Sequence, residues 1–455
     1  MTASRPPDPR RTALQVLDRL SGGRRSLDRL MEEAYENHRL DQRDRNLATT
    51  LVYGVLRRRG HLDWIIAQLG NRPFEKIHPR VLNILRLGLF QLLYLDRVPD
   101  SAAVNTAVGL ARTTGMPWAA GFVNALLRGF LRAKARPAPP DYAQDPVQAL
   151  AVRQSIPTWL ARRWIQRYGL EAARALARTC NRLPPLTLRA NTLRTDRRGL
   201  MEKLAGEGLS AVPTPVAPQG VTVSEAGRAV ADLRAFREGL FQVQDEAAQL
   251  VGHMVSPRPG QRVLDACAGL GGKTGHLAQL MENRGAVTAL DNRRWRLEKL
   301  RTAMRRLGVD IVETREGDLT RSVSRILSGP YDHVLVDAPC SGLGVLARNP
   351  DARWTLREAD LARQQARQLR MLAQAAPLVA PGGRLVFAVC SLEPEENEAV
   401  VRGFLERHAD FTTESAPLGH LPAAAGLVDD EGFLRTFPPR DGMDGFFAAA
   451  LRRRR

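Results

Sequence analysis

The sequence of 455 residues has little cysteine, few aromatic side chains and no long apolar run. It contains four cysteines, with no Cys-x-x-Cys pair and no histidine cluster at the spacing of metal ligands. We therefore expect neither a disulfide framework nor a structural zinc site. No apolar stretch approaches the ~20 residues that cross a bilayer, and residues 1–12 are polar and rich in proline and arginine. These absences predict a cytoplasmic protein without a membrane segment.

Acidic residues are also in deficit. The chain holds 67 Lys and Arg against 48 Asp and Glu, so the net charge is 67 − 48 = +19. Residues 1–140 hold 23 basic and 12 acidic side chains, so 23 − 12 = +11 of this excess lies in under a third of the chain. Such a balance favours a polyanionic partner, nucleic acid before an anionic membrane. The alternative explanation is that all proteins of the organism are rich in arginine, which would give the same positive net charge without a polyanionic partner.

The length suggests roughly three domains. Within residues 12–134, apolar side chains recur at three- and four-residue spacing, which predicts an all-α domain over residues 1–136. Glycine- and proline-containing breaks at 22–23, 70–73, 98–100 and 115–117 separate its helices. Residues 136–141 (Arg-Pro-Ala-Pro-Pro-Asp) are typical of a stiff linker. Residues 141–245 mix helical and extended patterns and predict a small α+β module.

The pattern changes after Gly260 to short β-branched runs, each followed by a helical stretch. The runs are residues 262–265, 286–291, 310–314, 332–337 and 384–390. Alternating strands and helices predict an α/β doubly wound, Rossmann-like domain over residues 246–455, with a parallel sheet. The final arginines, 452–455, predict a solvated tail. Ligands of such sheets bind beyond the carboxyl ends of the strands, where Asp265, Asp291, Asp337 and Cys390 fall.

A glycine-rich turn follows the first of these strands. The segment 265–274, Asp-Ala-Cys-Ala-Gly-Leu-Gly-Gly-Lys-Thr, lets its backbone approach a ligand closely. A P-loop is excluded because Cys267 stands where its first glycine is needed. Asp291 follows about 20 residues on, where a carboxylate accepts hydrogen bonds from a ribose. Nicotinamide enzymes and methyltransferases share this signature, and a turn that serves only helix packing is a further alternative.

Two cysteines stand at equivalent strand ends. Cys340 lies in Asp337-Ala-Pro-Cys-Ser-Gly342, and Cys390 begins Cys-Ser-Leu-Glu-Pro-Glu-Glu-Asn397. A thiolate at this edge of the sheet can attack an electrophilic carbon, and a second thiol can handle protons later in the reaction. Cys180 has no such setting, so we interpret it as a small buried apolar residue.

These motifs resemble the RsmB-like (Sun/Fmu-type) ribosomal RNA cytosine-5 methyltransferases over nearly the whole chain. The most specific pieces are the two cysteine segments. Supporting pieces are Leu188-Arg-Ala-Asn191, Val243-Gln-Asp245, Asn349-Pro-Asp351 and Asp441-Gly-Met-Asp-Gly-Phe-Phe447. The N-terminal domain resembles RNA-binding NusB domains at 52–57 (Val-Tyr-Gly-Val-Leu-Arg) and 122–128 (Phe-Val-Asn-Ala-Leu-Leu-Arg).

The resemblance implies three domains: a NusB-like helical RNA-binding domain (1–136), an α+β RNA-binding module (141–245) and a methyltransferase domain (246–455). It implies S-adenosyl-L-methionine as the cofactor, held by Cys267, Ala268, Gly269, Leu270, Gly271, Gly272, Lys273, Asp291, Asp318 and Asp337. It also implies that Cys390 is the nucleophile that adds to C6 of a cytosine, that Cys340 assists release of the product, and that Asp337 contacts the reacting ring.

The chain departs from the family at two places. The family usually has Cys-Ala-Ala-Pro-Gly-Gly-Lys in the cofactor loop, and here Gly269-Leu270 replaces Ala-Pro. Leu offers a backbone N–H that Pro lacks, so we expect the cofactor site to survive with a less rigid loop. Val389 stands where Thr usually precedes the nucleophile. This second change should alter local hydrogen bonding alone.

The resemblance thus predicts transfer of a methyl group to C5 of a cytosine in small-subunit (16S) ribosomal RNA. We expect ribosomal RNA as the partner, no stable protein partner and a monomer. One alternative is a cytosine-5 methyltransferase of transfer RNA or DNA. Another is a non-catalytic RNA-binding assembly factor that has lost cofactor binding through the altered glycine loop.

Overall fold

The computed structural model describes residues 8–23, 26–38, 40–70, 72–133, 137–224 and 229–455. Residues 1–7 of the polar start and Arg136, the first residue of the predicted linker, lie outside these ranges. The chain forms two compact units. Unit 1 is Met1–Arg182 with Leu346–Glu358, and unit 2 is Leu183–Val345 with Ala359–Arg455. No helix of the described ranges has the length and apolar character needed to span a membrane.

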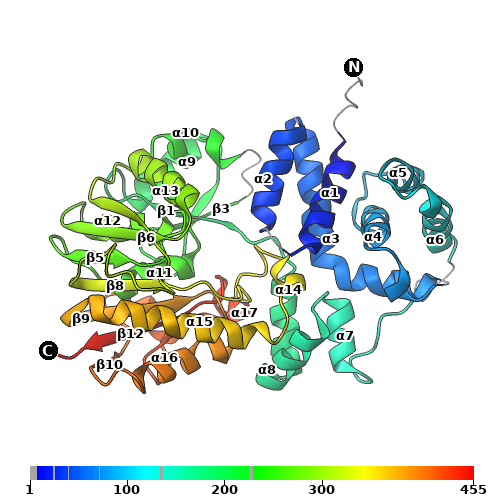
Figure 1. The fold of residues 1–455 in the computed structure, drawn as a ribbon. Helices are drawn as coiled ribbons and strands as arrows, with labels where there is room; N and C mark the ends of the chain where they lie inside the picture. Colours follow the sequence, from blue (N-terminus) through cyan, green and yellow to red (C-terminus); the bar gives the residue numbers. More distant parts are fainter. Residues whose placement is uncertain (1–7, 24–25, 39, 71, 134–136, 225–228) are drawn as a thin grey trace. The chain divides into compact units, whose positions relative to one another are not determined.

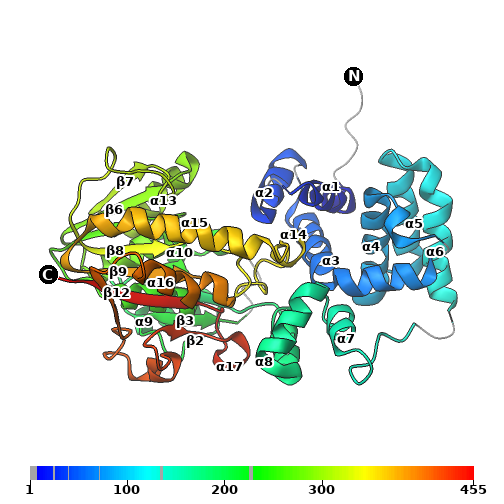
Figure 2. The ribbon, with the colours of Figure 1, turned by 60° about the horizontal axis from the view of Figure 1, so that its bottom comes forward.

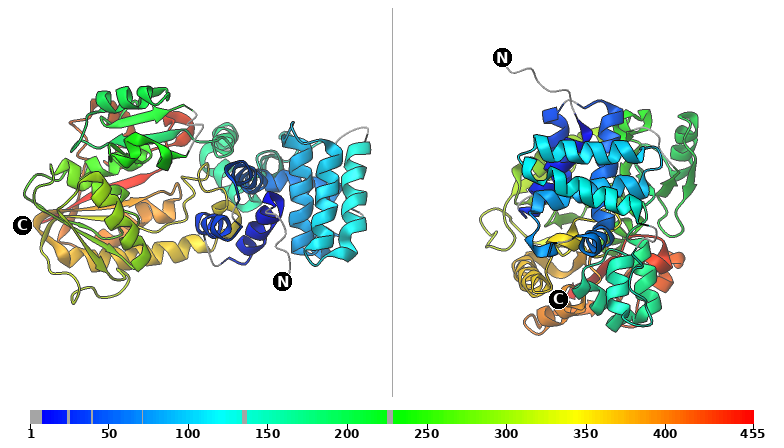
Figure 3. Two further views of the ribbon diagram at one scale, coloured as in Figure 1. Left: turned by 90° about the horizontal axis from the view of Figure 1, so that it is seen from above. Right: turned by 90° about the vertical axis from the view of Figure 1, so that its right-hand side faces the viewer.

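Unit 1 is helical in its described part (Figure 1). Its main helices are α1 (Pro9–Ser21), α2 (Leu27–His38), α3 (Gln42–Leu69), α4 (Pro79–Tyr94), α5 (Asp100–Thr113), α6 (Ala120–Arg132), α7 (Pro146–Arg153), α8 (Thr158–Thr179) and the short α14 (Ala352–Thr355). The predicted breaks separate α1, α3, α4, α5 and α6 as expected. Helix α2 was not marked by the apolar repeats. Helices α4, α5 and α6 run side by side (Figure 3).

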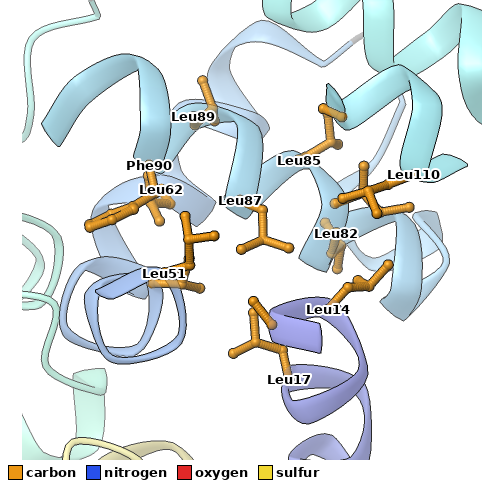
Figure 4. Packing of buried hydrophobic residues seen from close by; sticks show 14 of the residues in the cluster. Leu14, Leu17, Leu51, Leu62, Leu82, Leu85, Leu87, Leu89, Phe90 and Leu110 are labelled. Carbon is orange, nitrogen blue, oxygen red and sulfur yellow. The ribbon is translucent and has the colours of Figure 1, made fainter. Parts of the chain in front are cut away.

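The apolar repeats of α1 and α3–α6 form one core in unit 1. Leu14 and Leu17 of α1 point toward Leu51 of α3 and Leu82 of α4 (Figure 4). Gly54 allows close packing within this core, because a Cβ there would lie 2.0 Å from the ring of Phe90. Any larger residue would clash with Phe90, which explains why the segment 52–57 contains a glycine at this position.

The segment Leu346–Glu358 folds with unit 1 through a buried arginine. Arg353 is 0% exposed. Its guanidinium donates to Asn181 Oδ1 (2.8 Å) and to three backbone oxygens, those of Cys180 (2.9 Å), Ser155 (3.2 Å) and Leu346 (3.4 Å). Burial lowers its pKa to about 10, so the side chain stays charged at neutral pH. Cys180 is itself buried at the end of α8, as expected for a small apolar residue.

The first part of unit 2 holds the strands of the small α+β module that was predicted over residues 141–245, whereas α7 and α8 of that range belong to unit 1. This part of unit 2 contains β1 (Leu186–Ala190), α9 (Arg197–Gly206), β2 (Ala211–Pro213), β3 (Gly220–Val223), α10 (Arg234–Arg237) and β4 (Phe241–Val243). Its sheet has the order β2-β3-β1-β4, with antiparallel neighbours. Side chains of β1 alternate between two faces. Leu188 and Ala190 enter the core of the module, and Thr187 and Arg189 are buried on the opposite face.

The rest of unit 2 is built around a larger sheet with the order β10-β12-β9-β8-β5-β6-β7. Its strands are β5 (Arg262–Asp265), β6 (Ala286–Asp291), β7 (Val312–Glu316), β8 (Tyr331–Asp337), β9 (Val379–Val389), β10 (Phe411–Glu414) and β12 (Phe447–Arg453), with the short β11 (Leu434–Arg435) pairing with β12. The five predicted strands pair in parallel, as expected. The third begins two residues later than predicted, and the fifth begins five residues earlier and ends one residue earlier.

Helices cover both faces of this sheet. Alternate strand residues such as Val263 and Leu335 pack with α11 (Glu246–Val255), α12 (Gly272–Leu280) and α13 (Arg294–Leu307). The intervening residues, such as Leu264 and Val336, pack with α15 (Asp360–Ala375) and α16 (Glu398–Leu405). Figure 2 shows α15 and α16 lying together along the sheet. The short helix α17 (Pro438–Asp441) precedes β12.

Two expectations for the C-terminal region were wrong. The sheet is mixed, because β12 pairs antiparallel with both β9 and β10. The terminal arginines do not form a wholly solvated tail, since Arg452 and Arg453 belong to β12. Arg452 pairs with Glu414 at 2.6 Å and Arg453 pairs with Asp410 at 3.1 Å. Backbone pairing and these two carboxylates therefore fix residues whose charge alone suggested solvation.

The buried position of Arg353 gives a test of how the segment 346–358 is held. Arg353→Met keeps the apolar stem but leaves buried carbonyl oxygens without donors, so it should lower the free energy of unfolding by about 3 kcal/mol. The measurement is denaturant unfolding followed by circular dichroism. Arg128→Met removes an exposed arginine of α6 and should change stability by less than about 0.5 kcal/mol. Equal effects of the two changes would contradict this account.

Candidate active site

The predicted site residues gather at one edge of the large sheet. Strands β6, β5, β8 and β9 are neighbours in that order, and β5, β6 and β8 end at Asp265, Asp291 and Asp337. Cys390 follows the last residue of β9, and Cys340 lies in the loop after β8. The two sulfur atoms are 3.3 Å apart, and both side chains are half-buried. The structure thus brings together two thiols that are 50 residues apart in the chain.

A buried carboxylate holds the two cysteine loops together. Glu396 is 0% exposed and accepts from the backbone N–H of Ser341 (2.8 Å), from the Ser341 hydroxyl and from the Ser391 hydroxyl (2.6 Å). Gln368 of α15 donates to the same carboxylate at 3.2 Å and to the carbonyl of Pro339 at 3.1 Å. Each serine directly follows one of the cysteines. The network therefore fixes the backbone beside both sulfur atoms.

Glycines allow a further close contact at this site. The N–H of Gly344 donates to the carbonyl of Cys390 (3.0 Å), and the N–H of Gly445 donates to the carbonyl of Gly344 (2.9 Å). A Cβ on Gly344 would lie 2.0 Å from the oxygen of Gly445. The segment 441–447, singled out in the sequence, thus contributes a backbone that packs against the loop after β8. Val389 is fully buried in the apolar core beneath Cys390.

The environment keeps the thiol of Cys340 protonated. Its hydrogen-bond contact with Cys390, together with burial, raises the pKa of Cys340 well above its usual value. Burial and three neighbouring aspartates likewise raise the pKa of Cys267. Cys340 is therefore suited to carry a proton.

Asp337 is held by a lysine from the glycine-rich loop. Lys273 Nζ lies 2.6 Å from Asp337 Oδ2 and 5.2 Å from the centroid of the Phe446 ring. Burial alone would lower the pKa of Lys273, but the ion pair with Asp337 raises it above its usual value. The sequence assigned Lys273 to the cofactor loop and gave no sign of this pairing. In the structure it connects the loop with the end of β8.

The glycine-rich loop leaves its backbone open at two positions. Gly269 and Gly271 have φ values of +54° and +87°, which favour glycine. A Cβ on Gly269 or Gly272 would meet no atom within 4 Å, so the backbone faces open space at both positions. Leu270, the departure from the family pattern, is 52% exposed and needs no change in the core.

Asp291 supports this loop from the end of β6. Its Oδ2 accepts from the N–H of Gly269 (3.1 Å), and its Oδ1 accepts from the N–H of Arg293 (2.8 Å). Oδ2 also lies 3.6 Å from Nη1 of Arg296, whereas Oδ1 keeps a second lone pair that can accept from a ligand hydroxyl. Asp318 lies beyond β7, where hydrogen bonds from the hydroxyl and N–H of Thr320 lower its pKa. The open glycine backbone and these carboxylates fit an adenosine-containing cofactor.

Asp265 lies beneath the loop as a buried acid. It is 1% exposed and accepts from the Thr274 hydroxyl at 2.7 Å. Burial raises its pKa to about 6. The hydrogen bond from Thr274 therefore connects the first turn of α12 to the end of β5.

Sequence reasoning missed the role of Arg189. This side chain of β1 is 0% exposed and donates to the carbonyl of Gly272 (2.9 Å), to Gln279 Oε1 (3.1 Å) and to Gln244 Oε1. Burial lowers its pKa to about 9. Arg189 thus joins the small module to the first residue of α12, next to Lys273. Arg189 and Gln244 belong to the sequence motifs 188–191 and 243–245. These motifs were the features of the sequence that could have indicated this contact.

Comparisons with known proteins match each part of the chain. A family model described as 16S rRNA methyltransferase RsmB/F matches residues 253–452, the NusB family model matches residues 7–132, and an RsmF/B-like ferredoxin-like domain model matches residues 156–230. The probable ribosomal RNA small subunit methyltransferase B of Bacillus subtilis is 35% identical over 97% of this chain and 98% of its own length. The chain belongs to the ribosomal RNA small subunit methyltransferase B family. The enzyme of that name from Pseudomonas putida is 34% identical over 98% of both chains.

Solved structures agree with this family assignment. The crystal structure of PH0851 is similar with a TM-score of 0.82, 27% identity, and coverage of 99% of this chain and 100% of that one. A methyltransferase homologue from Pyrococcus horikoshii has a TM-score of 0.58, 29% identity, and coverage of 68% and 99%. The predicted fold class is confirmed: a NusB-type helical domain, a small ferredoxin-like module and a Rossmann-like methyltransferase domain. The cofactor of this methyltransferase family is S-adenosyl-L-methionine, as predicted.

The network around Glu396 predicts how strongly the site depends on one carboxylate. Glu396→Ala leaves two hydroxyls and the Ser341 N–H without their acceptor, so it should lower the free energy of unfolding by about 3 kcal/mol. Glu406→Ala changes an exposed glutamate just after α16 and should cost less than about 0.5 kcal/mol. Thermal unfolding measures both. A Glu396→Ala protein as stable as the Glu406→Ala protein would show that the network does not stabilise the site.

Proposed function

We propose that the protein transfers a methyl group from S-adenosyl-L-methionine to C5 of a cytosine in small-subunit ribosomal RNA through a covalent bond between Cys390 and C6. The observation that carries the proposal is the pair of sulfur atoms 3.3 Å apart at two adjacent strand ends, beside Asp337. Family membership supports methyl transfer to ribosomal RNA. The names of the relatives do not specify the base or the atom, so the cytosine and C5 rest on the chemistry of these side chains.

Covalent addition solves the chemical difficulty of this reaction. C5 of cytosine is too weak a nucleophile for direct methylation, and attack of the Cys390 thiolate on C6 makes C5 enamine-like. S-adenosyl-L-methionine supplies an electrophilic methyl group when bound. After the C5–methyl bond has formed, a base removes the C5 proton, the double bond is restored, and the bond between Cys390 and C6 breaks.

Asp337 contacts the reacting ring in this proposal. Its carboxylate accepts a hydrogen bond from the exocyclic amine and thereby orients the ring for attack at C6. Lys273 fixes its orientation through the 2.6 Å ion pair. A carboxylate fixed in advance holds the ring in one orientation with little loss of energy to reorganisation.

Cys340 assists the last stage. Its thiol is kept protonated by its contact with Cys390 and by burial. It therefore does not compete as a nucleophile at neutral pH, and it lies beside the sulfur that must leave.

The residues that hold the cofactor are proposed from the same geometry. Asp291 accepts from the ribose, Asp318 lies near the adenine, and the backbone of residues 267–273 holds the methionine part. The open space over Gly269 and Gly272 is the observation that favours a cofactor over a turn used for packing alone.

Ribosomal RNA is the proposed partner because of family membership and charge. The +11 excess of residues 1–140 gives phosphate-binding capacity to the NusB-type domain. The target cytosine must be in a loop or flipped from its stack, because stacking hides C6. A cytoplasmic location and a monomeric state stay predictions.

The decisive test is to map 5-methylcytosine in small-subunit ribosomal RNA from cells with and without the gene, together with methylation of the same RNA by the purified protein. One cytosine should lose its methyl group without the gene and regain it with the protein. Methylation of transfer RNA alone would establish the alternative substrate. No methyl transfer in the presence of measurable cofactor binding would overturn the proposed reaction.

The two cysteines should give opposite phenotypes although both changes stop turnover. Cys340→Ala keeps the attack but hampers elimination, so a protein–RNA adduct should accumulate and survive denaturing electrophoresis. Cys390→Ala removes the attacking sulfur, and the double variant should form no adduct. An adduct formed by Cys390→Ala and not by Cys340→Ala would exchange the roles.

Asp291 should contribute to cofactor affinity and not to RNA affinity. Asp291→Ala removes the proposed ribose acceptor and should weaken S-adenosyl-L-methionine binding by ~1.5–3 kcal/mol in calorimetry. Glu298→Ala, an exposed change on the adjacent helix α13, serves as the control and should leave binding unchanged. Unaltered cofactor affinity in a folded Asp291→Ala protein would place the ribose elsewhere.

A further inference from the structure

Unit 1 contains a polar cavity of about 400 Å³ that the proposed reaction does not use. Its walls come from the end of α1, from α3 and α4, and from the segment 354–357. Three arginines line it, namely Arg59, Arg86 and Arg357, and its lining includes no carboxylate. The volume lies within the ~300–1,000 Å³ range of small-ligand sites.

Arg59 and Arg86 at this cavity lie near a single shared carboxylate. Asp63 accepts two hydrogen bonds from Arg86, at 2.6 and 2.9 Å, and lies 3.6 Å from the Nε of Arg59. That Nε is buried and has no hydrogen-bond partner. Asp18, the other nearby carboxylate, is occupied by Arg80 (2.7 Å) and Asn83 (2.8 Å). Two guanidinium groups therefore share one carboxylate, which leaves Arg59 able to bind an added anion.

The other walls offer an aromatic ring and apolar contacts. Trp354 lines the cavity, with the guanidinium of Arg59 5.2 Å from its ring centroid. A hydrogen bond from its Nε1 to the carbonyl of Leu56 (2.7 Å) fixes the indole. Leu17, Leu20 and Val55 add apolar surface. Arginine beside an indole is the combination that binds a phosphate together with a flat base.

We propose that this cavity binds one unpaired nucleotide of the substrate RNA, with its phosphate at Arg59 and Arg357 and its base against Trp354 and the leucines. The proposal rests on the proposed function, which makes RNA the substrate. An unpaired nucleotide is required because bases in an A-form duplex are stacked and cannot enter a cavity. The site would anchor RNA on unit 1, whereas the proposed reacting residues belong to unit 2.

Two variants of the full-length protein test charge and space separately. Arg59→Ala removes the incompletely paired cation and retains the hydrogen bonds of Asp63 with Arg86. Ser21→Trp fills the cavity from the exposed end of α1 and keeps all three arginines. Arg112→Ala removes the same charge from an exposed position on α5 that does not line the cavity. Thermal unfolding checks that each variant is folded.

The measurement is fluorescence anisotropy with a short labelled single-stranded oligoadenylate. Arg59→Ala and Ser21→Trp should each weaken binding ~10-fold, the scale of one stacked base, and Arg112→Ala should weaken it less than ~2-fold. Arg59→Lys should recover part of the loss. The same affinity for Ser21→Trp as for the unaltered protein, or equal losses in Arg59→Ala and Arg112→Ala, would overturn the proposal. If Arg59→Ala does not fold, Ser21→Trp decides alone.

Free adenosine 5′-monophosphate distinguishes an RNA site from a site for a free nucleotide. It should displace the labelled oligoadenylate weakly, because it lacks the neighbouring phosphates. Binding of the monophosphate tighter than that of the oligoadenylate would overturn the assignment to RNA. Ribosomal RNA methylation by the unaltered protein, measured in parallel, separates the two proposals. If the unaltered protein methylates ribosomal RNA but Ser21→Trp leaves RNA affinity unchanged, the cavity site is rejected. If the variants lose RNA affinity as predicted but the unaltered protein does not methylate, the proposed reaction is rejected.

Discussion

The buried carboxylate of Glu396 is the interaction on which the candidate active site depends. Parallel strands bring β8 and β9 side by side, but the cysteines stand in the loops beyond them. Glu396 accepts from the residue after each cysteine and from Gln368 of α15, so one side chain fixes two loops against a helix. The close approach of the two sulfur atoms follows from this network. An unpaired carboxylate at 0% exposure would be costly, and its four donors explain why it is tolerated.

A second buried polar group connects the small module with the cofactor loop. Arg189 extends from β1 to the carbonyl of Gly272, and the next residue, Lys273, pairs with Asp337. The chain of contacts therefore runs from the module through the start of α12 to the strand end that would face the substrate ring. It gives the small module a structural connection to the site besides its proposed RNA contacts.

Much of the fold followed from local patterns. The β-branched runs marked the five parallel strands because each is short, apolar and followed by a helix, and the helical repeats marked the core of the NusB-type domain. Long-range pairing was less visible. Strand β12, with its run of alanines, has no strong β-branched signal, and its antiparallel position depends on β9. The insertion of 346–358 into unit 1 depends on Arg353, which an isolated sequence presents as an ordinary surface residue.

The candidate site was likewise predictable in part. The strand-end rule placed Asp291, Asp337 and Cys390 at one edge, and the motif placed Cys340 beside them. The partners of Glu396, Arg189 and Lys273 could not be predicted, because each lies at least five residues away in sequence and on a different element or loop.

The central claim, covalent attack by Cys390, is tested most directly with RNA that carries 5-fluorocytosine at the target. After methyl transfer, C5 has no proton to lose, so the protein should stay bound to the RNA. Mass spectrometry of the digested adduct should find the nucleotide on Cys390, whereas a nucleotide on Cys340, or methyl transfer without any adduct, would contradict the account.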